Sequence, residues 1–179
     1  MILKKTITWK EIMDNWEKNE KELWQPFYQK KGFISWFSWR NSYVEKLNLE
    51  QKKWKVFSVI PQEILNFNCG AFRGWLEASF EVNSRKFQDL IYSKIFLNNE
   101  KIKAIQENFS QFTQIIGFKK NNKIFIFEGN HRCIAISDFI IKKKINLQIK
   151  LEICLTTLSA AKEYPFIDFY EEINSPFNK

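Results

Sequence analysis

The chain has few of the residues that build disulfide frameworks, metal centres and tight turns. Its 179 residues include three cysteines, one histidine, five glycines and four prolines. The cysteines, Cys69, Cys133 and Cys154, are odd in number and far apart, which argues against a disulfide framework and against zinc-type ligand spacing. We therefore expect free thiols and a reducing compartment, the cytoplasm.

Long apolar runs are also missing. No stretch approaches the roughly 18 apolar residues that a membrane-spanning helix needs. The first residues, Met1 to Lys5, lack the apolar region of a signal peptide. We expect a protein without a membrane partner.

Basic and aromatic side chains, by contrast, are abundant. The formal net charge is +8, from 28 basic and 20 acidic residues, and aromatic residues make up 17% of the chain. The positive excess favours a polyanionic partner such as a nucleotide, a nucleic acid or an anionic surface, although a generally basic proteome gives the same balance. The hydrophobic content of 45% suffices for the core of one globular unit.

The first third of the chain has helical periodicity and many aromatic residues. Residues 8–11 (Thr-Trp-Lys-Glu) fit a capping box at the start of an amphipathic helix over 9–22. Pro26 is expected to begin or break a second, short helix. Over 33–44, aromatic residues are interleaved with Arg40, a pattern that either stacks on the bases of a single strand or covers the core. We favour core burial, which is what most aromatic side chains do.

The remaining elements follow from apolar periodicity and turn residues. A strand closed by Pro61 is expected over 54–61, then a short helix over 62–65 and a loop over 68–74. The elements expected after this loop are helices over 84–97 and 100–110, strands over 112–116 and 123–127 joined by a turn over 117–122, a helix over 132–144 and a strand over 147–155.

The segment 127–132 (Phe-Glu-Gly-Asn-His-Arg) holds the only histidine and lies where an apolar β-type run gives way to a helix. The first backbone N–H groups of a helix lack intrahelical partners and suit an anion. Gly129 lets the backbone approach a phosphate closely. The amides near Asn130 and the guanidinium of Arg132 can bind phosphate oxygens. This turn is therefore a candidate phosphate-binding site.

Two residues of the turn are suited to proton transfer or metal binding. His131 can donate to a phosphate or shuttle a proton near neutral pH. Glu128 can act as a base or help to hold a magnesium ion. The alternative is structural, with Glu128 on the surface, His131 capping a turn and Arg132 in a salt bridge. A sole histidine beside glycine and arginine at a helix start favours the functional interpretation.

The order strand, turn, strand, Glu-Gly-Asn-His-Arg, helix, strand resembles the ParB/sulfiredoxin superfamily. The positions that carry the resemblance are Glu128, Gly129, His131, Arg132 and Ala135, with the strand and Ile-Pro turn of Val56 to Leu65. It covers about 54–66 and 100–155. The resemblance implies an α+β fold, with a small mixed β-sheet and flanking helices over 54–179 and an insertion at about 67–99. An aromatic-rich helical N-terminal extension over 1–53 would pack on this core to form a single globular unit.

Departures from the family narrow the choice. Sulfiredoxin chemistry uses a cysteine just before the His-Arg pair, where this chain has Asn130, so sulfinic-acid reduction is not expected. Partition proteins of the ParB type carry a DNA-reading helix-turn-helix domain after the phosphate turn. This chain ends soon after its last expected strand, and we expect no such domain. The Asp-Gly-His-His-Arg turn of ADP-dependent free serine kinases is similar to 128–132 in length and chemistry.

The resemblance implies a nucleotide-dependent phosphotransferase or nucleotide hydrolase. The expected ligands are ATP, ADP or CTP with Mg²⁺, and an unknown small-molecule acceptor. The phosphates would be bound by Gly129, Asn130, His131 and Arg132. Glu128 and His131 would act as acid and base, Glu128 would hold the metal, and Glu63 or Glu77 would bring a further acid near His131. Two alternatives stay open: a nucleic-acid-binding protein or nuclease, and a non-catalytic binding module.

Overall fold

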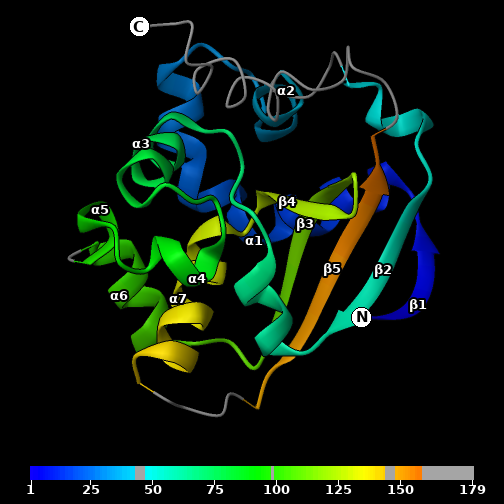
Figure 1. Ribbon diagram of the computed structural model, residues 1–179. Helices are drawn as coiled ribbons and strands as arrows, with labels where there is room; N and C mark the ends of the chain where they lie inside the picture. The colour runs from blue at the N-terminus through cyan, green and yellow to red at the C-terminus, as the bar shows by residue number, and fades with distance from the viewer. Residues whose placement is uncertain (43–46, 98, 144–147, 159–179) are drawn as a thin grey trace, which may run out of the picture.

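The computed structural model describes residues 1–42, 47–97, 99–143 and 148–158, and its centre is one mixed β-sheet. Five strands follow the order β1-β2-β5-β3-β4 (Figure 1). They are β1 (Ile2–Ile7), β2 (Trp54–Val59), β3 (Phe112–Lys120), β4 (Lys123–Glu128) and β5 (Lys150–Thr157). β3 and β5 are parallel, and the other neighbouring pairs are antiparallel. The expected α+β class with a small mixed sheet is confirmed.

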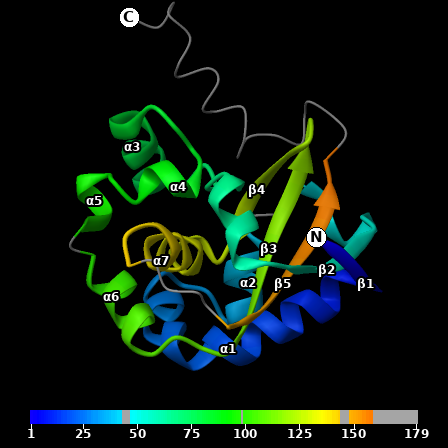
Figure 2. The same ribbon diagram turned by 60° about the horizontal axis from the view of Figure 1, so that its bottom comes forward.

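Helices cover both faces of the sheet, because each face carries its own apolar side chains. The face with Trp54 and Ile116 packs against α1 (Trp9–Lys30) and α2 (Trp36–Asn41), and α1 crosses beneath the strands in Figure 2. The neighbouring Ile115 points to the opposite face, as the period of two in a strand requires. That face is covered by the 3₁₀ helix η3 (Pro61–Asn66), α3 (Arg73–Val82), α4 (Phe87–Leu90), α5 (Lys94–Leu97), α6 (Glu100–Glu107) and α7 (Asn130–Ile141).

Tryptophans join the N-terminal helices to the sheet. Trp9 of α1 stacks on Trp54 of β2 with ring centroids 5.1 Å apart. Trp16 meets Trp36 of α2 edge to face at 5.2 Å. Such pairs add to the burial of large apolar surfaces, so the N-terminal extension packs firmly on the core.

Arg40 lies inside this aromatic cluster. Its guanidinium carbon is 4.0 Å from the ring centroid of Trp39 and 4.7 Å from that of Trp16. Trp36 and Trp39 are buried, with 0% and 3% of their surfaces exposed. The core interpretation of the segment 33–44 is therefore correct for these two rings but wrong for Phe37, which is 39% exposed. Residues 43–44 lie outside the described part of the chain.

The expected capping box begins α1. The backbone N–H of Glu11 donates to Oγ1 of Thr8 at 3.2 Å, and the Glu11 carboxylate accepts from the Thr8 N–H at 2.8 Å. The sequence predicted that Pro26 would begin or break a second helix. The structure instead has one helix that continues through Pro26 to Lys30. Proline costs one backbone hydrogen bond at this point. Tyr28, two residues further along the helix, is buried.

The N-terminal segment 1–53 also contributes a strand that the sequence did not predict. All residues of β1 except Ile7 are exposed, so no alternating pattern marks it. β1 pairs with β2 at the edge of the sheet. The segment is therefore part of the sheet and not only a helical layer upon it.

Other boundaries differ where glycine was taken as a turn signal. β3 continues through Gly117 to Lys120, and the hairpin turn consists of Asn121 and Asn122, both with positive φ. The loop expected over 68–74 ends early, because α3 begins at Arg73.

Three further segments keep their predicted type with altered limits. The helix expected over 84–97 is divided into α4 and α5. The helix over 132–144 is α7, which begins two residues earlier, and the strand over 147–155 is β5, which begins at Lys150. Residues 144 and 147 lie outside the described part of the chain. None of the described helices combines the length and hydropathy needed to cross a membrane.

Candidate functional site

The candidate turn joins β4 to α7, and Gly129 is the residue that makes it possible. Its φ is +99°, a conformation that residues with a Cβ rarely adopt. A Cβ at this position would overlap Cγ2 of Ile115 and lie 3.0 Å from its Cβ. Glycine is thus required by the geometry of the turn and by its packing on β3, whether or not a phosphate approaches it.

The Asn130 side chain holds the turn in place. Its Oδ1 accepts a hydrogen bond from the Gly70 N–H at 3.0 Å. Its Nδ2 donates to the carbonyls of Ile126 at 3.2 Å and Phe127 at 3.4 Å. With 6% of its surface exposed, this amide is engaged by the protein itself. Asn130 can therefore serve a ligand through its backbone N–H, not through its side chain.

The start of α7 remains suited to an anion. No side chain of the described residues caps the N-terminus of this helix, since its N-cap is Gly129. The backbone N–H groups of the first turn carry a partial positive charge. The residues of this first turn line a cavity.

Arg132 and Glu128 form an ion pair across the turn. Their side chains are 30% and 14% exposed. The salt bridge that was one interpretation of Arg132 is therefore present. Both residues line the cavity beside the turn.

His131 is half-buried and electrically neutral at pH 7. Its ring meets Trp75 edge to face, with centroids 5.1 Å apart. Burial, with added repulsion from Lys101 and Arg132, lowers the pKa of His131 from 6.5 to about 4. The predicted proton shuttle near neutral pH does not match this lowered pKa. A neutral imidazole still offers one N–H donor.

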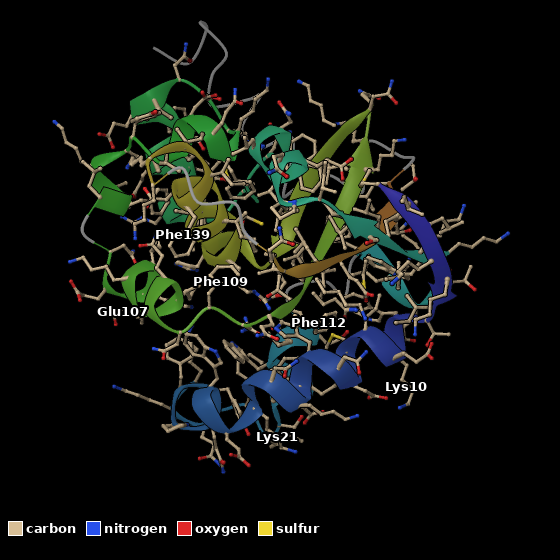
Figure 3. The ribbon with its side chains drawn as sticks, turned by 90° about the horizontal axis from the view of Figure 1, so that it is seen from below. Lys10, Lys21, Glu107, Phe109, Phe112 and Phe139 are labelled. Carbon is tan, nitrogen blue, oxygen red and sulfur yellow. The ribbon has the colours of Figure 1, made fainter. Side chains whose placement is uncertain are left out.

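A cavity of about 760 Å³ opens beside the turn. Its walls come from α1, α6, the start of β3 and residues 128–132. Figure 3 views the molecule from below and shows Phe112, one of the lining residues, next to α1 at this end of the sheet. The cations among its described lining residues are Lys18, Lys101 and Arg132. Glu128 is the one carboxylate among them, so the cavity carries a positive excess.

The further acids expected near His131 are elsewhere. Glu63 accepts a hydrogen bond from the Ile60 N–H at 3.1 Å, and Glu77 pairs with Arg73 at 3.1 Å on the exposed surface of α3. Neither lies among the described residues of the cavity wall. The third acid predicted from the sequence is therefore not brought to this site by Glu63 or Glu77.

A resident magnesium site does not fit the described residues. They contain no group of three or more His, Cys, Asp or Glu side chains placed to hold a metal ion. Glu128 stands as a single carboxylate and is paired with Arg132. Magnesium takes several oxygen ligands and is commonly bound together with substrate phosphates, so an ion here would arrive with the nucleotide.

Sequence reasoning missed the residues that complete the cavity. Lys101 on α6, Trp24 on α1 and Gln114 on β3 line it together with the turn. Each comes from a separate segment of the chain. Apolar periodicity identified their elements but carries no information on which polar side chain faces a shared cavity.

The chain matches no protein-family model, no curated protein and no solved structure. The resemblance to the ParB/sulfiredoxin superfamily thus rests on the motif over 128–135 and on the order of elements.

Proposed function

We propose that the protein binds a nucleotide in the cavity between α1 and the turn over 128–132, and acts as a nucleotide-dependent phosphotransferase or nucleotide hydrolase. One observation carries the proposal: the turn selected from the sequence as a phosphate site lines a cavity of about 760 Å³ with a positive excess. Small-molecule sites commonly occupy roughly 300–1,000 Å³. A nucleotide therefore suits the cavity in size and in charge.

The phosphates and the base of a nucleotide would contact different kinds of residue in the cavity. The phosphates would lie against Arg132 and the first N–H groups of α7, which suit anionic oxygens. The base would lie toward the aromatic wall that includes Trp24 and Phe112, with the amides of Gln114 and Asn15 available as hydrogen-bond partners. Aromatic rings bind bases by stacking, and amides distinguish their edges.

The chemistry would rest on positioning and charge neutralisation, as in other phosphoryl transfers. A phosphate that draws Arg132 away from Glu128 leaves the carboxylate to accept a proton from the attacking hydroxyl or water. The oxygen of that group bonds to phosphorus while the bond to the leaving nucleotide oxygen breaks. His131, neutral and half-enclosed, would donate its N–H to a phosphate oxygen. An adjacent phosphate would also raise the pKa of this imidazole.

A nucleic-acid-binding role draws less support from the geometry. The net charge of +8 favours it, but the rings of Trp36 and Trp39 are buried and not available for stacking on bases. A non-catalytic module would bind the same nucleotide without turnover. A nucleotide ligand and three free, buried thiols both suit the cytoplasm as the proposed location.

Binding of ATP, ADP and CTP, with and without Mg²⁺, tests the proposal by isothermal titration calorimetry. We expect Arg132→Ala to weaken binding by about ten- to hundredfold, since a hydrogen bond to a charged group contributes about 1.5–3 kcal/mol. Arg73→Ala is the matched control, because Arg73 also forms an i,i+4 ion pair with a glutamate but lies exposed and away from the cavity. Equal affinity of the Arg132→Ala and native proteins, or no nucleotide binding at all, would overturn the proposal.

Turnover is measured next on any nucleotide that binds. Release of inorganic phosphate indicates hydrolysis, and transfer to an added hydroxyl compound indicates a kinase. Glu128→Gln should lower the rate far more than it lowers the affinity, since the amide retains the shape of the side chain but accepts no proton. Binding without any turnover would leave the binding-module alternative in place of the enzyme.

A further inference from the structure

Lys101 is a cation of the cavity wall whose charge is not neutralised by the described part of the protein. It lies in the first turn of α6, and its Nζ is 5.2 Å from the ring centroid of Trp24 on α1. Its ammonium forms no ion pair or side-chain hydrogen bond with a described residue. The ammonium of Lys101 therefore lies over the ring of Trp24, and this contact joins α6 to α1 at the cavity.

Lys101 is an exposed residue in the first turn of α6. The first turn of a helix carries partial positive charge and favours Asp or Glu over Lys. Lys103, in the same helix, is neutralised by Glu100 at 2.9 Å, whereas Lys101 is not. Lys101 also shares the cavity wall with Arg132, and both repel a proton from His131 and so help to lower its pKa. Three basic groups therefore converge on one space.

We propose that Lys101 is a second phosphate-binding residue of this site, and that its ammonium leaves the ring of Trp24 when a phosphate binds. Phosphate entry draws the ammonium from the ring to the phosphate oxygens. This exchange is favourable because a charge-assisted hydrogen bond to phosphate is stronger than an exposed cation–π contact. It also frees the face of Trp24 for the base. The inference rests on the proposed function and adds a residue that the turn alone does not supply.

The ligands that test this role are ADP and inorganic pyrophosphate, because pyrophosphate has the phosphates without the base. We expect Lys101→Met to weaken the binding of both by about tenfold, while Lys101→Arg, which keeps the charge, retains most of the affinity. Lys103→Met is the matched control, since Lys103 lies in the same helix but does not line this cavity. It should leave both affinities unchanged.

A second measurement needs no ligand. His131 is the only histidine, so its titration by NMR is unambiguous. Lys101→Met should raise the pKa of His131 in the free protein, and Lys103→Met should change it much less. A cooperative unfolding transition together with this titration verifies that the variant is folded.

The outcomes separate the two proposals. If the native protein binds neither ligand, both fail. If Arg132→Ala loses binding while Lys101→Met binds as tightly as the native protein, the nucleotide site stands and the role of Lys101 is refuted. A tenfold loss for Lys101→Met, with Lys103→Met unaffected and Lys101→Arg close to the native affinity, supports the role of Lys101 as a phosphate-binding residue.

Discussion

Replacing Gly129 with alanine tests how firmly packing fixes the turn before α7. At a φ of +99°, a residue with a Cβ is strained by about 1–2 kcal/mol. The new Cβ also overlaps Cγ2 of Ile115 and lies 3.0 Å from its Cβ. Ile115 is fully buried on a central strand, and overpacking of such a site costs about 1–3 kcal/mol. The free energy of unfolding should therefore fall by about 2–5 kcal/mol.

Alanine substitutions at two other glycines distinguish the strain of a positive φ from the overlap with Ile115. Stability is measured by urea-induced unfolding. Gly32 has a φ of +83° but open space around it, so Gly32→Ala should lose only about 1–2 kcal/mol. Gly74 lies in α3 with neither constraint, and Gly74→Ala should be neutral or stabilising by less than about 1 kcal/mol. A loss for Gly129→Ala no greater than that for Gly32→Ala would refute the contact with Ile115. Ile115→Ala should also cost about 1–3 kcal/mol less in the Gly129→Ala background than alone.

Three other side chains give further tests. Asn130→Ala removes the acceptor of the Gly70 N–H and should lower the free energy of unfolding by about 1–3 kcal/mol in urea titrations; no loss would contradict its structural role. His131 should titrate by NMR with a pKa of about 4, and a value near 6.5 would contradict its burial. The unfolded chain binds this proton at higher pH than the folded chain, so the free energy of unfolding should fall as pH drops from about 6.5 toward 4. His131→Gln should remove the part of this pH dependence that comes from His131. Pro26→Ala supplies the missing hydrogen-bond donor to the Glu22 carbonyl and should raise the free energy of unfolding by about 2 kcal/mol, whereas a less stable variant would show that proline is needed there.

The final third of the chain was the easiest to predict because its elements bury whole faces. β4, α7 and β5 lie within a few residues of their expected positions. β1 was missed for the opposite reason: five of its six residues are exposed, so alternation is lost. α3 was missed because Gly74 in its first turn was taken as part of a loop. Glycine is a weak signal where a helix begins with it.

The residues of the candidate site also differ in how well the sequence predicts them. The residues of 128–132 are contiguous, so a strand, a glycine and a helix start identify them together. Lys101 and Trp24 meet them only in space. One lysine among 28 basic residues has no local pattern that distinguishes it from a solvated neighbour. The ion pair of Arg132 and the lowered pKa of His131 likewise depend on the tertiary environment.

Helix α1 contributes residues both to the hydrophobic core and to the wall of the cavity. Its buried residues Trp9 and Met13 pack in the core, while Asn15, Lys18 and Asn19 are exposed side chains that line the cavity. Substitutions at these three positions alter the wall of the cavity without entering the hydrophobic core. Under the proposed function, ligand preference can therefore change through one helix while the turn over 128–132 keeps its geometry.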